Sequence, residues 1–230
     1  MKMGLLATFV CFASMPACGQ TLQAVVGVTT NTAALCQDIQ NSATTITASI
    51  SGPACNWNDG ADSGSGSGTA TAAYGVLQSN ATASEIITAQ ATNTGSQTGG
   101  SFSDTLTFPN LSTDAFLRAT LTVSVTDSAS QSGEVLVSGD VILAGSSNCI
   151  LQVLKGSCTT TLPVTPGSQV PIQGSFLVTA AVGPSSGSST FTADGKKSFG
   201  ARYAFVLVDA AGHKLNVPLV AASGTNYPNK

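Results

Sequence analysis

The stretch LRATLTVSVTD, residues 117–127, carries the pattern that decides the fold. Its apolar residues alternate with arginine and hydroxyl residues; the apolar positions are Leu117, Ala119, Leu121, Val123 and Val125. Successive side chains of an extended strand point to opposite faces, so this period of two places the apolar residues on one face and the hydroxyls on the other. The stretch therefore predicts a strand with one face in a core and the other in solvent.

The same pattern recurs on both sides of this stretch. After the polar turn SASQSG (128–133) it resumes over residues 135–143, which predicts a long hairpin. Comparable runs begin at Gln23, Thr44, Ser175, Tyr203 and Leu215. About ten to twelve strands separated by Gly, Ser, Asn and Pro turns predict an all-β fold, an antiparallel, jelly-roll-like β-sandwich with little helix.

The low charge content excludes several classes of protein. Only 8% of the chain is charged, and the formal net charge is −3. A chain so poor in Lys and Glu has little material for exposed helices, which need a charged outer face. A small negative balance gives no electrostatic footprint for DNA or RNA. We expect a single β-sandwich domain over residues 20–230, with no nucleic acid as a partner.

The N-terminal region is typical of a secretory leader. Lys2 precedes an apolar stretch over residues 4–13, and small residues follow as far as Gly19. The apolar stretch is shorter than the about 20 residues that a membrane-spanning helix requires. We therefore expect residues 1–19 to be a signal peptide and the mature protein to be secreted or at the cell surface, without a membrane span. A lipoprotein leader with the lipid on Cys18 is the alternative.

Four cysteines remain after the leader, namely Cys36, Cys55, Cys149 and Cys158. An even set in an exported chain predicts disulfides, and four cysteines permit three connectivities between which the sequence does not choose. The local pairing, Cys36 with Cys55 and Cys149 with Cys158, has the lowest closure cost because both loops are short. Neither pair has zinc-site spacing, and the only histidine is distant. We expect no metal and no cofactor.

Catalytic signatures are lacking in the sequence. The single histidine, His213, follows the turn DAAG, and no Gly-x-Ser-x-Gly elbow presents a serine to it. The 11 acidic residues are scattered, with no pair suited to glycoside hydrolysis. We therefore predict that the protein is not an enzyme and that His213 is a solvated turn residue.

Asp104 is the most unusual acid in the sequence. In FSDTLTF (102–108) it shares a strand face with Phe102, Leu106 and Phe108. A carboxylate that points toward a core must be paired or hydrogen-bonded. We expect it to accept backbone N–H bonds, and the alternative is an anchor for calcium or a polar ligand.

The segment NWNDGADSGSGSG (56–68) supplies the candidate ligand-binding residues Trp57, Asp59 and Asp62, to which Tyr74 is added from the next segment. A flat aromatic ring beside amides and carboxylates suits the face of a sugar. Gly60 falls one position too early for an EF-hand loop. The Gly/Ser run over 63–68 has no apolar surface to bury, so we expect residues 36–68 to form a disulfide-stapled flap followed by a mobile hinge.

Three segments resemble exported bacterial proteins of the PEP-CTERM type: AYGVLQSNATAS (73–84), SFSDTLTFPNLS (101–112) and AFLRATLTVSVTDSASQSG (115–133). The segment ARYAFVLVDAAGHKLNV (201–217) is similar to the final hairpin of their β-sandwich. The chain departs from this family at its end, where SGTNYPNK stands in place of the C-terminal sorting signal. The resemblance implies export, a sandwich fold and an association with extracellular or surface material.

Together these features predict a secreted or cell-surface, non-catalytic protein with a structural, extracellular-matrix or adhesive role. Its expected partners are extracellular polysaccharide or other surface proteins. The alternative is a carbohydrate-binding module that uses Trp57.

Overall fold

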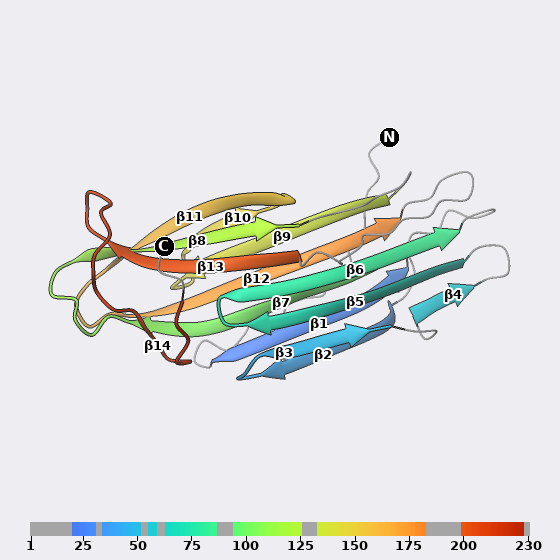
Figure 1. Cartoon of the computed structure of the whole chain (residues 1–230), viewed down its shortest axis with the longest axis horizontal. Helices are drawn as coiled ribbons and strands as arrows, with labels where there is room; N and C mark the ends of the chain where they lie inside the picture. Colours follow the sequence, from blue (N-terminus) through green and yellow to red (C-terminus); the bar gives the residue numbers. More distant parts are fainter. Residues whose placement is uncertain are drawn as a thin grey trace.

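The computed structural model describes residues 20–30, 34–51, 55–58, 63–86, 94–125, 133–182 and 199–227, which form two antiparallel sheets packed against each other (Figure 1). In spatial order, sheet A consists of β10 (Ser147–Leu151), β9 (Gly133–Leu143), β12 (Gln169–Val182), β7 (Thr94–Thr107), β1 (Thr21–Thr30) and β2 (Ala34–Ser42). The short strand β14 (Val220–Ala221) pairs with β7 beside this path.

Sheet B is the second layer of the sandwich. Its spatial order is β11 (Lys155–Val164), β8 (Ala115–Ser124), β13 (Phe199–Val208), β6 (Val76–Ile86), β5 (Ser63–Ala73) and β3 (Ile46–Ile50). The strand β4 (Asn56–Asn58) pairs with β5 beside this path. The described residues contain fourteen strands and no α-helix, so the predicted all-β sandwich is confirmed.

The core lies between the sheets and follows the alternation seen in the sequence. In β8, Leu117, Ala119, Leu121 and Val123 are all completely buried, while the intervening hydroxyl residues face outward. Phe102 of β7 and Tyr203 of β13 meet edge to face in the middle of the core, with ring centroids 4.9 Å apart. Such pairs add to the stabilisation that burial of apolar area provides.

The predicted hairpin between residues 117–125 and 135–143 is wrong. β8 belongs to sheet B, where it pairs with β11 and β13, whereas β9 belongs to sheet A, where it pairs with β10 and β12. Alternation identifies a strand with one buried face, but in a sandwich either sheet satisfies that requirement. The chain therefore crosses from one layer to the other between these two strands.

The Gly/Ser run over 63–68, which we expected to be a mobile hinge, forms the first half of β5 and pairs with β6 along its whole length. Gly66 and Gly68 face the core, where side chains of sheet A lie too close for a β-carbon to fit without a shift. A β-carbon at Gly66 would lie 2.7 Å from Cγ1 of Val28, and one at Gly68 would collide with Thr98. The missing side chains are therefore what allows this strand to pack.

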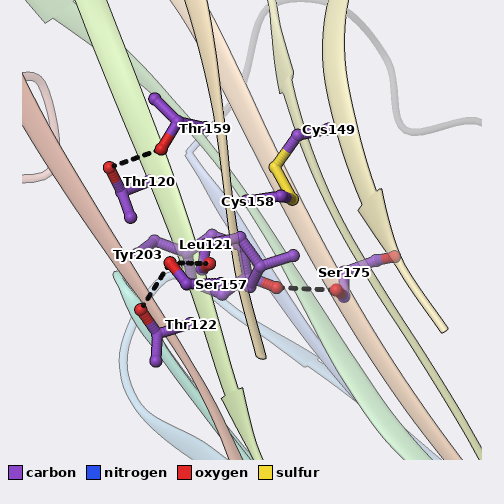
Figure 2. Close-up of a disulfide and its surroundings, with 9 residues drawn as sticks. All are labelled: Thr120, Leu121, Thr122, Cys149, Ser157, Cys158, Thr159, Ser175 and Tyr203. Atoms are coloured by element: carbon purple, nitrogen blue, oxygen red, sulfur yellow. Dashed lines mark hydrogen bonds between the residues drawn. A yellow bond between two sulfur atoms is a disulfide. The ribbon is translucent and has the colours of Figure 1, made fainter. Parts of the chain in front are cut away.

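Of the three connectivities that the sequence left open, the structure has the local one with the lowest closure cost, and each disulfide joins the two sheets. Cys36 of β2 is bonded to Cys55, the residue before β4. At the opposite side of the sandwich, Cys149 of β10 is bonded to Cys158 of β11 (Figure 2). Because β2 and β10 are the outer strands of sheet A, the two bonds close the two lateral seams of the sandwich. Two disulfides are compatible with an oxidising environment.

Candidate functional site

The structure places the predicted binding residues Trp57 and Tyr74 at opposite ends of β5. The backbone of Trp57, in β4, pairs with Gly64 near the start of β5. Tyr74 lies in the turn that follows the last residue of β5. Asp59, Asp62 and the side chain of Trp57 lie outside the described part of the chain. The described residues therefore do not bring these two aromatic positions together in one site.

Tyr74 packs against the core. Its ring meets Phe102 edge to face at 6.4 Å, and its hydroxyl group is buried and has no hydrogen-bond partner among the described residues. Burial, together with the nearby Asp104 carboxylate, raises the pKa of the Tyr74 hydroxyl. The side chain thus contributes packing at this end of the sandwich.

The buried side chain of Asp104 joins β7 to the C-terminal segment through hydrogen bonds. The side chain is only 2% exposed. Its carboxylate accepts hydrogen bonds from the Tyr227 hydroxyl at 2.8 Å, from the Ser223 hydroxyl at 2.5 Å and from the Ser223 backbone N–H at 3.1 Å. The Thr105 backbone N–H donates to the same carboxylate at 2.8 Å. The expectation that Asp104 accepts backbone N–H bonds is confirmed by the Thr105 and Ser223 donors, and the two hydroxyl donors from the C-terminal segment come in addition.

His213 occupies an exposed turn, as predicted. Its backbone N–H donates to Asp209 Oδ1 at 2.8 Å, and its ring Nδ1 lies 3.1 Å from Asp209 Oδ2. The backbone hydrogen bond from His213 is the main reason that the pKa of Asp209 is lowered. Asp209 also accepts from the Ala211 N–H at 2.9 Å, so the carboxylate holds the turn together.

A groove of about 890 Å³ lies on the outer face of sheet A. Its floor is formed by side chains of β9, β12 and β7, and one wall is the segment 152–155 that leads from β10 to β11. The volume is within the range of sites for small ligands. Leu136 and Leu177 form an apolar strip in it, and Ser138, Ser175 and Thr179 add hydroxyl groups.

Two side chains in this groove, Asp140 and Gln97, have oxygen atoms that accept fewer hydrogen bonds than they could. Asp140 accepts a hydrogen bond from the Ser175 backbone N–H at 3.0 Å, but no described basic residue forms an ion pair with it. Burial raises the pKa of the Asp140 carboxyl, so its ionised form is held at a cost. Gln97 is 9% exposed, and its side-chain Oε1 is buried without a partner among the described residues. A half-buried carboxylate without an ion-pair partner and a buried amide oxygen without a hydrogen-bond partner, both judged among the described residues, mark a candidate site.

Sequence reasoning missed this groove because its residues become neighbours only through sheet A. Asp140 lies in register with Ser175, and Thr179 lies in register with Gln97. Each of the strands β7, β9 and β12 is separated from the others in the sequence, and the order β9-β12-β7 is set by pairing across the sheet. The one local signal was the acid at position 140 inside an apolar, alternating run.

Comparisons with known proteins give no family for the chain: no family model, no curated protein and no solved structure matches it. In the part of the chain that the structure describes, no helix has the length and apolar character needed to cross a membrane. Within the same part, no group of three or more His, Cys, Asp or Glu side chains has the arrangement of a metal site.

Proposed function

We propose that the protein is an exported, non-catalytic β-sandwich protein of the cell surface or extracellular matrix, with a structural or adhesive role. The observation that carries this proposal is the position of the two disulfides, one at each lateral seam between the sheets. Covalent closure of both seams suits a protein that must stay folded in a medium without chaperones. The resemblance to exported proteins of the PEP-CTERM type and the leader-like residues 1–19 support the same role.

The outer face of sheet B supports an adhesive role. It carries cross-strand pairs of hydroxyl side chains on several neighbouring strands, some of them drawn in Figure 2. The pairs are Thr47 with Thr71, Ser67 with Thr82, Thr120 with Thr159, and Thr122 with Ser157. Such a surface offers many hydrogen-bond donors and acceptors and little charge, which suits neutral hydrated polymers such as extracellular polysaccharide.

Localisation in the native host tests this proposal. The full chain with a C-terminal epitope tag would be expressed in the host, which would then be treated with protease from outside and fractionated. We expect the tagged protein in the surface or matrix fraction, sensitive to the added protease, and with its cysteines oxidised in alkylation assays. Recovery in the cytosol with free thiols would overturn the proposal.

A pull-down with insoluble polysaccharides tests the adhesive part of the role. Replacement of Thr120, Thr122 and Thr159 by Val would remove hydroxyls from one strip of the outer face while keeping β-branched side chains. We expect retention on the polysaccharide to fall without loss of folding. Equal retention of the wild type and the triple variant on the polysaccharide would contradict an adhesive role for this face.

A further inference from the structure

The polar and apolar side chains in the groove on sheet A form a diagonal across three strands. Asp140 of β9 pairs with Ser175 of β12, and two positions further along β12, Leu177 pairs with Ser138 of β9. Another two positions along, Thr179 pairs with Gln97 of β7. The diagonal thus has an acceptor at each end, Asp140 and Gln97, and the apolar Leu177 between them.

Sheet geometry gives the length of this diagonal. Two steps between strands cover about 10 Å, and the four residues from Ser175 to Thr179 cover about 13 Å. The α-carbons of Asp140 and Gln97 are therefore roughly 16 Å apart, and their side chains reduce the gap that a ligand must span. A compact ligand cannot reach both ends of such a groove, whereas an extended one can.

The chemistry at the two ends calls for hydrogen-bond donors. Asp140 is a half-buried carboxylate without an ion-pair partner among the described residues. The side-chain oxygen of Gln97, which lines the groove, is buried without a partner among the same residues, and a rotation of the amide would bring it to a ligand. A cationic N–H group would neutralise the charge of Asp140 and donate a further hydrogen bond to its carboxylate. Between the ends, Leu177 and Leu136 offer apolar surface for methylene groups, with Val153 and Leu154 on the wall.

We propose that this groove binds an elongated aliphatic amine, a diamine or polyamine, with one ammonium group on Asp140 and an N–H donor at the other end on Gln97. Its methylene chain lies across Leu177 and Leu136. This inference is independent of the structural role proposed above, because it rests only on the groove. Sugars fit less well, since no aromatic side chain occurs among the described lining residues to stack on a pyranose.

Isothermal titration of the oxidised mature chain with α,ω-diamines of increasing length tests the proposal. The series diaminobutane, diaminooctane and diaminododecane keeps the charge constant while the span grows. We expect binding to tighten roughly tenfold or more from diaminobutane to diaminooctane, because more methylene groups are buried and both ends become reachable. The neutral octanediol should bind at least tenfold more weakly than diaminooctane. Absence of binding by every diamine, or equal binding of octanediol, would overturn the proposal.

Two variants separate a specific site from general attraction between an acidic protein and a cation. Asp140→Asn removes the carboxylate of the groove, and Glu134→Gln removes an exposed carboxylate from the same strand, β9, outside the groove lining. We expect Asp140→Asn to weaken diaminooctane binding roughly tenfold or more and Glu134→Gln to change it less than about twofold. Equal effects of the two substitutions would overturn the assignment of the site. Far-UV circular dichroism would confirm that both variants are folded.

Discussion

Among single residues, the buried Asp104 and the half-buried Asp140 show how the surroundings of an acid determine its role. Asp104 is surrounded by donors from Ser223, Tyr227 and Thr105, so its carboxylate is well satisfied and ties the C-terminal segment to β7. Asp140 accepts only from Ser175 among the described residues, and burial raises its pKa. Asp104 therefore stabilises the fold. The surroundings of Asp140 instead disfavour its ionised form, as is common for residues that bind a ligand.

The hydrogen bond between Tyr227 and Asp104 gives the first prediction. Tyr227→Phe removes a donor from a buried carboxylate, and we expect a loss of about 1.5 to 3 kcal/mol in the free energy of unfolding. Tyr74→Phe is the matched control, because it removes from a nearby ring a buried hydroxyl group that has no partner in the described part of the chain. That substitution should be neutral or slightly stabilising. Urea unfolding followed by circular dichroism measures both, and equal losses would mean that the Tyr227 hydrogen bond contributes nothing specific.

The pKa of Asp140 gives a prediction about pH. Because burial raises this pKa above 3.8, the folded state favours the neutral acid. Below pH 3.8 the carboxyl is neutral in both the folded and the unfolded state, and the fold has its full stability. As the pH rises from there through the pKa of the folded state, the half-buried carboxyl must ionise, and the free energy of unfolding falls. We expect Asp140→Asn to be more stable than the wild type at about pH 7, by about 1 kcal/mol, and equally stable at about pH 3. Urea unfolding at both values checks this, and a pH-independent difference would refute the explanation.

For the elements, alternation in the sequence predicts strands well and their partners poorly. The buried face of β8 was predictable residue by residue, since Leu117, Leu121 and Val123 repeat every second position. The sheet to which β8 belongs could not be predicted, because either layer of the sandwich can bury that face. β5 shows a second limit: composition predicted a mobile linker where Gly66 and Gly68 are required by the approach of sheet A. The groove was unpredictable for the same reason as the β8 pairing, since it depends on the order of strands in sheet A.

The close approach at β5 can be tested with two substitutions in the same strand. Gly66→Ala places a methyl group within 2.7 Å of Val28, so the sheets must move apart. We expect a loss of about 1 to 3 kcal/mol in the free energy of unfolding. Thr69→Val, on the outward face, should change it by less than about 0.5 kcal/mol. A neutral or stabilising Gly66→Ala in thermal unfolding would show that the strand tolerates side chains on its inner face and that its glycines have another cause.

On the scale of the whole molecule, the sandwich is closed by covalent bonds at both seams and by packing in between. Aromatic residues of both layers, such as Phe102 and Tyr203, fill the middle. At the seams the outer strands have a neighbour on one side only, and there Cys36–Cys55 and Cys149–Cys158 join the layers. Fraying of a sandwich begins at such outer strands, where fewer contacts hold the backbone. The bonds are therefore placed where they prevent separation of the sheets.

Removal of each disulfide in turn gives the last prediction. The closed loops span 19 and 9 residues, and the loss of chain entropy in the unfolded state predicts contributions of about 3 and about 2.5 kcal/mol. We expect the Cys36→Ser, Cys55→Ser double variant to lose slightly more stability in urea than the Cys149→Ser, Cys158→Ser variant. Hydrogen exchange adds a test of position: amides of β2 should exchange faster in the first variant, and those of β10 and β11 in the second. Uniform acceleration across both sheets would show that the bonds act only on the unfolded chain and do not hold the seams of the folded sandwich.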